Sequence, residues 1–191
     1  MQSVVAFKSK DNVYIVSNTS LSVNSMLFDL QLNNIKVIEG SNIIMALTGD
    51  NSEIAYLDEL ADCLPKKEID SFDKKYIVDN LVPMFHRALH KGNVIKLNDN
   101  GILELNLNII LAYQDSLFIV RSNFDVIEIA DYIVSGEYDD LFNVRLFDLN
   151  TDNMLEEVIH LFTDFRKICP LLDSKVMVVD TKSRIIEERE C

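Results

Sequence analysis

Two β-branched and aromatic runs near the N-terminus limit the possible folds more than any other feature of this sequence. The runs are residues 4–8 and 12–18, and the turn-prone, charged triplet of residues 9–11 between them predicts a β-hairpin. Within the second run, Val13 and Val16 fall on opposite faces of the strand. Because both faces are partly apolar, we expect a sheet that is covered on both sides.

Similar patterns predict further strands and three helices. The predicted strands cover residues 35–39, 42–48, 105–111, 117–121, 125–130, 176–179 and 185–186, and the predicted helices cover residues 50–64, 71–90 and 151–169. The first helix begins with Asp50 and Glu53 at a capping-box spacing and ends at Pro65. Pro83 lies inside the second helix and should kink it or delay its start, at a cost of about 3 kcal/mol.

The order of these elements predicts the fold class. Strands that pair by hairpins, with helices gathered in separate blocks, are typical of an α+β fold in which helices cover antiparallel sheets. No linker, repeat or shift in composition divides the 191 residues. We therefore predict a single domain over residues 1–191.

The charge balance argues against one large class of partners. The chain has 18 basic and 31 acidic residues, a net charge of −13, and no basic stripe. Such a surface repels a phosphate backbone, so we expect no nucleic-acid partner. No signal-peptide pattern follows Met1, and no apolar run approaches the roughly 18 residues that span a bilayer. We expect a protein that stays inside the cell and has no membrane contact.

The sequence contains no motif for a cofactor or a structural metal. Cys63, Cys169 and Cys191 are widely spaced, which favours plain thiols in a reducing compartment over a disulfide framework or a zinc site. His86 and His90 stand four residues apart on a predicted helix and could offer two metal ligands. No third ligand follows by spacing, and the basic flanks of the pair favour a solvated helix face. We therefore predict no cofactor and no metal.

Several short segments together resemble β-type subunits of the proteasome: residues 3–8, 12–18, 35–39, 46–50 and 105–115. The likeness continues through the closing helix and strand to Asp180, so that it covers nearly the whole chain. The resemblance implies a four-layer αββα sandwich, with two antiparallel sheets between helix layers, which is the Ntn-hydrolase fold. This expectation agrees with the α+β pattern derived above.

Within that family, the sequence resembles most the non-catalytic subunit at the fourth β position of the eukaryotic 20S proteasome. The hairpin aligns from Met1 without a gap, and residues 25–38 resemble the characteristic loop and strand of that subunit. The resemblance implies a structural role in ring assembly and in the chamber where ubiquitin-tagged and other proteins are degraded. The implied partners are β subunits of the same ring and of the opposite ring and α-ring subunits, in the cytoplasm and nucleus.

The catalytic positions of the family are all changed. Its active members use an N-terminal threonine as the nucleophile, supported by an aspartate and a lysine. The resemblance places Gln2 at the threonine, Asn18 at the aspartate and Asn34 at the lysine, which implies a subunit that is not an enzyme. Gly49 matches a glycine of the oxyanion region, although backbone geometry at a strand-to-helix turn explains a glycine better.

Two other interpretations stay open. Removal of Met1 and Gln2 would make Ser3 an N-terminal serine, and a register shift of two residues would let Lys36 replace the missing lysine. The chain would then be an active N-terminal-nucleophile hydrolase. Alternatively, the chain is a free-standing binding module with a proteasome-like fold, which the size of the native protein would distinguish from a ring subunit.

Overall fold

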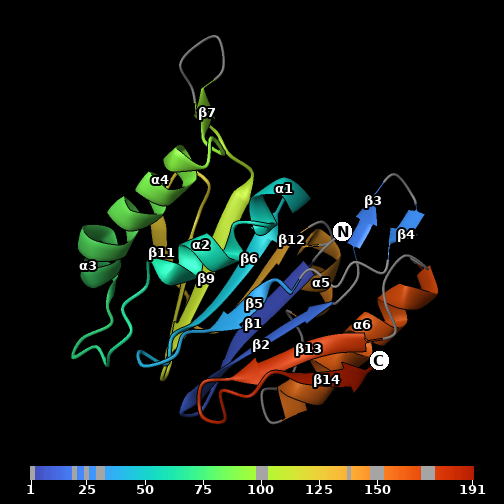
Figure 1. The fold of residues 1–191 in the computed structure, drawn as a ribbon. Helices are drawn as coiled ribbons and strands as arrows, with labels where there is room; N and C mark the ends of the chain where they lie inside the picture. Colours follow the sequence, from blue (N-terminus) through green and yellow to red (C-terminus); the bar gives the residue numbers. More distant parts are fainter. Residues whose placement is uncertain are drawn as a thin grey trace.

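In the part of the chain that the structure describes, two antiparallel β-sheets of five strands each form the centre of the molecule (Figure 1). This computed structural model describes residues 3–18, 21–23, 26–28, 33–97, 103–136, 139–146, 153–168 and 175–191. The strand order is β12-β1-β2-β13-β14 in the first sheet and β11-β10-β9-β6-β5 in the second. The prediction of an α+β fold with antiparallel sheets is confirmed.

The first sheet contains the predicted N-terminal hairpin. Its strands are β1 (Ser3–Ser9), β2 (Asn12–Asn18), β12 (Tyr132–Gly136), β13 (Lys175–Asp180) and β14 (Glu187–Glu190). A two-residue turn at Lys10 and Asp11 joins β1 to β2, and the φ of 50° at Lys10 is the left-handed value that such tight turns require. The register pairs Val4 with Ser17 on β2 and with Ser135 on β12, so a serine lies on each side of Val4.

The second sheet is formed by the middle of the chain. Its strands are β5 (Ile35–Val37), β6 (Ile44–Gly49), β9 (Leu107–Tyr113), β10 (Ser116–Val120) and β11 (Val126–Glu128). Two short pairs lie outside both sheets: β3 (Leu21–Val23) pairs with β4 (Met26–Phe28), and β7 (Lys96–Leu97) pairs with β8 (Leu103–Glu104).

Helices pack against both sheets. They are α1 (Asn51–Ile54), α2 (Leu57–Asp62), α3 (Lys74–Tyr76), the π-helix η1 (Ile77–Leu81), α4 (Val82–Lys91), α5 (Asp139–Leu146) and α6 (Met154–Ile168). Helices α2 and α4 lie on the side of the second sheet, and α5 and α6 lie on the side of the first (Figure 1).

Three apolar clusters account for the packing of these elements. The first lies between the sheets and includes Val4 and Ile15 of one sheet and Ile110 of the other. The second joins the second sheet to α2, η1 and α4 through side chains such as Phe85. The third joins the first sheet to α5 and α6 through side chains such as Phe162. Both sheets are thus covered on two faces, as the apolar pattern of the hairpin predicts.

The predicted helix over residues 50–64 forms as two short helices instead. A turn at Ala55 and Tyr56 separates α1 from α2. The Glu53 carboxylate accepts hydrogen bonds from the backbone N–H of Asp50, at 3.3 Å, and from that of Asn106, at 3.0 Å. One half of the predicted capping box therefore forms, and the same carboxylate also ties the helix start to the second sheet.

The predicted helix over residues 71–90 continues through Pro83 without a break. Asp73 caps its start, since the Asp73 carboxylate accepts a 2.7 Å hydrogen bond from the Tyr76 N–H. The π-helix η1 directly precedes Pro83, and the Val82 N–H bonds to the Ile77 carbonyl, five residues back. This wider turn accommodates the ring and the missing N–H of proline, so the predicted disturbance is local.

Candidate functional site

The positions at which the resemblance places an aspartate and a lysine lie buried near the N-terminal end of β1. Asn18 is the last residue of β2, and Asn34 directly precedes β5. Their exposed fractions are 1% and 0%. Gln2, which the resemblance places at the nucleophile, lies outside the described residues.

Both asparagine side chains are hydrogen-bonded. Asn18 Oδ1 accepts a 2.6 Å hydrogen bond from the backbone N–H of Ser3. Asn34 Oδ1 accepts a 3.0 Å bond from the Ser17 hydroxyl, and Asn34 Nδ2 donates a 3.1 Å bond to the Leu47 carbonyl. Because buried polar groups need such partners, the two amides are built into the core.

A second polar contact joins the sheets on the other side of Val4. The hydroxyls of Thr48 on β6 and Ser135 on β12 lie 2.6 Å apart, and Asn108 Nδ2 donates to the Ser135 hydroxyl at 3.2 Å. We name these side chains, together with Ser3, Ser17, Asn18 and Asn34, the polar seam. Sequence reasoning missed Ser17, Thr48, Asn108 and Ser135, although each interrupts a run of strand residues that is mostly apolar.

The Ser3 hydroxyl is an exception within the polar seam. Ser3 is fully buried, and its Oγ has no hydrogen-bond partner among the described residues. A buried hydroxyl without a partner costs about 1–3 kcal/mol. Its chemistry is that of an ordinary alcohol, because the Ser3 nitrogen is a peptide N–H that follows Gln2 and is already bonded to Asn18.

The polar seam offers hydrogen bonds but no acid or base. Its side chains are hydroxyls and carboxamides, which neither take up nor release a proton near neutral pH. A serine nucleophile needs an adjacent base that can accept its proton. As long as residues 1 and 2 precede Ser3, the seam has no group in that role.

Lys36, the substitute in the hydrolase interpretation, is directed elsewhere. Its Nζ forms an ion pair with the Asp58 carboxylate on α2, at the surface of the second sheet. The structure thus brings Asn34, rather than Lys36, into contact with Ser17 beside Ser3.

Backbone geometry explains why position 49 is a glycine. This residue ends β6 opposite Leu107 with a φ of 151°, and a Cβ atom there would lie 1.9 Å from the carbonyl oxygen of Asn106. Only glycine fits such a close approach of two backbones.

His86 and His90, the pair that could offer two metal ligands, lie on the exposed face of α4. The rings of His86 and His90 on α4 have centroids 6.3 Å apart, and His86 contacts the Phe124 ring at 5.2 Å. Among the described residues, no group of three His, Cys, Asp or Glu side chains is arranged to hold a metal ion. Within the same residues, no helix combines the length and apolarity needed to cross a membrane.

Comparison with known proteins shows likeness in fold and not in sequence. No protein-family model matches the chain, and no curated protein matches it. Solved structures of proteasome-like proteins do match: Anbu (ancestral beta-subunit) from Yersinia bercovieri has a TM-score of 0.71 at 11% identity, over 98% of this chain and 87% of that chain.

Two further structures show the same fold. The Anbu complex from Pseudomonas aeruginosa, described as a helical assembly, has a TM-score of 0.69 at 10% identity, over 99% of this chain and 86% of that chain. The structure described as Thiobacillus denitrificans BPH has a TM-score of 0.67 at 13% identity, over 93% of this chain and 96% of that chain. At these identities the likeness establishes the fold alone.

These neighbours correct the expectation drawn from the resemblance. The chain is similar to Anbu proteins, a bacterial proteasome-like family, and the assignment to the fourth β position of the eukaryotic 20S proteasome is wrong. The predicted role of this chain as a structural subunit of the eukaryotic 20S particle is therefore also wrong. The physical reason is that a tight hairpin and a glycine at a strand-to-helix turn are requirements of the fold, so they cannot distinguish one group of proteins with this fold from another.

Proposed function

We propose that this chain is a catalytically inactive proteasome-like module that assembles with copies of itself. The four-layer αββα arrangement of Ntn hydrolases belongs to this proposal. It is supported by the three apolar clusters, one between the sheets and one beneath each group of helices.

The pair of buried asparagines carries the proposal that the chain is inactive. Asn18 and Asn34 stand where the resemblance places an aspartate and a lysine, and both amides are engaged in hydrogen bonds with the core. Exchanging either amide for a charged side chain would bury a charge, which is costly without a partner. The local structure is thus adapted to neutral side chains rather than to a catalytic charge pair.

Self-assembly is supported by the fold and by one neighbour. The Pseudomonas Anbu structure is described as a helical assembly, and it matches this chain over nearly its full length. When one face of a subunit binds a different face of the next copy, the contacts close into a ring or continue as an open helix. A single kind of chain is sufficient for either outcome.

We expect no reaction with electrophilic peptide probes aimed at N-terminal threonine nucleophiles. Purified protein should show no mass increase after incubation with such a probe, because the polar seam has no base to activate a hydroxyl. Intact-mass spectrometry measures this, with an active threonine protease as the positive control.

Labelling at Ser3 would contradict the proposed inactivity and favour the hydrolase interpretation. Two observations make Ser3 the most informative residue: its hydroxyl is buried with no hydrogen-bond partner among the described residues, and its nitrogen donates to Asn18. Ser3→Ala is the matched variant, since it should abolish labelling if Ser3 reacts and should change nothing if the protein is inert.

We expect the purified chain to form a defined homo-oligomer. Size-exclusion chromatography with light scattering should give a mass several times that of one chain, and negative-stain images should show rings or short helical filaments. A particle containing several different β-type chains would contradict self-assembly. A monomer at every concentration would instead favour the second candidate, a free-standing binding module.

Localisation to the cytoplasm and nucleus stays a prediction.

A further inference from the structure

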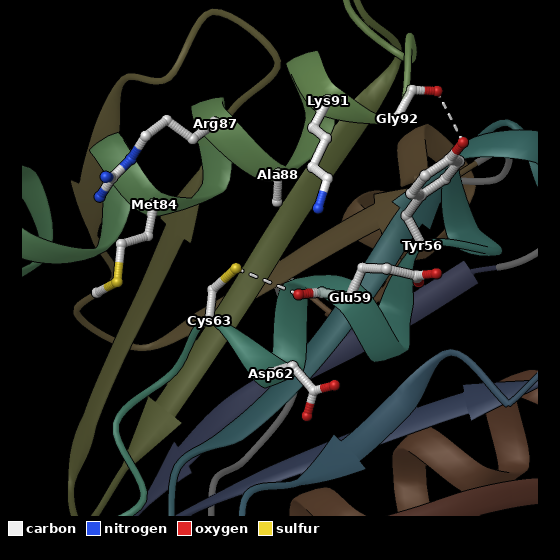
Figure 2. A pocket seen from close by; sticks show the side chains of 9 residues that line it. All are labelled: Tyr56, Glu59, Asp62, Cys63, Met84, Arg87, Ala88, Lys91 and Gly92. Atoms are coloured by element: carbon white, nitrogen blue, oxygen red, sulfur yellow. Dashed lines mark hydrogen bonds between the residues drawn. The ribbon is translucent and has the colours of Figure 1, made fainter.

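A cleft opens between α2 and α4 on the outer side of the second sheet, away from the polar seam. Its volume is about 650 Å³, within the range of about 300–1,000 Å³ typical of ligand sites. Figure 2 shows the side chains that line it: Tyr56, Glu59, Asp62 and Cys63 from α2 and its flanks, and Met84, Arg87, Ala88, Lys91 and Gly92 from α4 and its end.

One end of the cleft is held by a fixed contact between its two walls. The Tyr56 hydroxyl donates a 2.8 Å hydrogen bond to the Gly92 carbonyl (Figure 2). A Cβ atom on Gly92 would lie 2.3 Å from Cε1 of Tyr56, so a larger residue there would push the ring out of this position. This contact sets the distance between the end of α4 and the start of α2.

The two walls carry charges of opposite sign. Glu59 and Asp62 lie on the α2 side, and Arg87 and Lys91 lie one turn apart on the α4 side (Figure 2). Asp62 forms an ion pair with Lys66 outside the cleft. Among the described residues, Glu59, Arg87 and Lys91 form no ion pair. Arg87 Nε donates a 3.2 Å hydrogen bond to the Pro83 carbonyl, and its guanidinium extends past Met84, away from Lys91 (Figure 2). One anion, Glu59, and one cation, Lys91, therefore remain for a ligand.

Between the charged walls the lining is largely apolar. Met84, Ala88 and the Tyr56 ring offer hydrocarbon and aromatic surface to a ligand. Partial burial, reinforced by the Asp62 charge and opposed by Arg87, raises the pKa of the Cys63 thiol. The thiol therefore stays protonated at neutral pH, donates to the Glu59 carbonyl at 3.2 Å, and acts as lining rather than as a nucleophile.

We propose that this cleft binds short peptides with free termini and apolar side chains. The terminal ammonium pairs with Glu59, the terminal carboxylate pairs with Lys91, and the apolar side chains lie against Met84, Ala88 and Tyr56. A simple anion would leave Glu59 unpaired, and a simple cation would leave Lys91 unpaired. A molecule with both charges on an apolar body matches all three features, whether or not the chain assembles.

The proposal is tested with the dipeptide Leu-Leu and its blocked form, N-acetyl-Leu-Leu-amide. Titrations followed by ¹H–¹⁵N NMR of the intact protein should show saturable shifts at Tyr56, Ala88 and Gly92 with Leu-Leu. The blocked peptide should bind about tenfold more weakly, because it keeps the apolar body but loses both charges. Equal affinity for both peptides, or no saturable shift with Leu-Leu, would overturn the proposal.

Variants separate the charged walls from the apolar lining. Glu59→Gln and Lys91→Gln should each weaken Leu-Leu binding about two- to fivefold, as expected for the loss of one exposed charge pair. Ala88→Phe should abolish binding by filling the cleft without a change in charge. Lys74→Gln, an exposed lysine outside the cleft, is the matched control and should bind normally. Unchanged affinity in Glu59→Gln and Lys91→Gln would refute the assignment of the termini.

Discussion

We expect Gly49→Ala to lower the free energy of unfolding by about 3 kcal/mol or more, because the new Cβ meets backbone rather than a movable side chain. The φ of 151° disfavours any L-residue, and the Asn106 carbonyl oxygen lies 1.9 Å from the position of the Cβ. Relief of the overlap would require β6 and β9 to separate where Gly49 pairs with Leu107. Chemical denaturation followed by circular dichroism measures the loss.

Ser52→Ala serves as the control for this variant. Ser52 is exposed on α1, two residues beyond Asp50, and its replacement should change stability by less than about 0.5 kcal/mol. A Gly49→Ala protein as stable as the parent would show that the junction of β6 and α1 is more adaptable than its geometry indicates.

The second large effect is expected at Phe142, which anchors α5 to α6. Phe142 is fully buried, and its ring centroid lies 4.7 Å from that of Phe162 and 4.5 Å from that of Phe165. Phe142→Ala would remove one member of this aromatic cluster and leave a cavity, at a cost of about 3–5 kcal/mol. Thermal and denaturant unfolding should both report the loss.

Val144→Ala is the matched control on the same helix. Val144 is 74% exposed, so its truncation removes little buried surface, and alanine has the higher helix propensity. Its stability should remain within about 0.5 kcal/mol of the parent. If Phe142→Ala had the same free energy of unfolding as Val144→Ala, α5 would contribute little to the stability of the fold.

Helix α5 also illustrates what periodicity could not predict. Its buried residues are Phe142 and Leu146, four apart, but Leu141 and Val144 are equally apolar and lie exposed. Apolar residues therefore occur around the helix, and no single stripe stands out in the sequence. The π-helix before Pro83 and the turn that splits α1 from α2 were missed for a related reason, since both depend on how the helices pack on the second sheet.

For the polar seam, residue type alone determined which chemistry is missing. Asn18 and Asn34 can neither carry a charge nor transfer a proton, wherever they lie. Which side chains they meet is a different matter, because Ser17 lies on β2 of the first sheet, Asn34 directly precedes β5 of the second, and Thr48 and Ser135 are 87 residues apart. Hydrogen bonds of that kind become visible only when the two sheets are packed together.

The sequence by itself determined the local structure: a hairpin with apolar side chains on both faces, helices that begin near residues 50 and 71, and neutral carboxamides at Asn18 and Asn34. These features depend on alternation, capping and side-chain chemistry, which act over a few residues. The tertiary structure alone decided the pairing of the sheets, the polar seam and the cleft between α2 and α4. It also replaced the eukaryotic assignment with a likeness to Anbu, because the arrangement of elements persists at identities where local motifs no longer distinguish relatives.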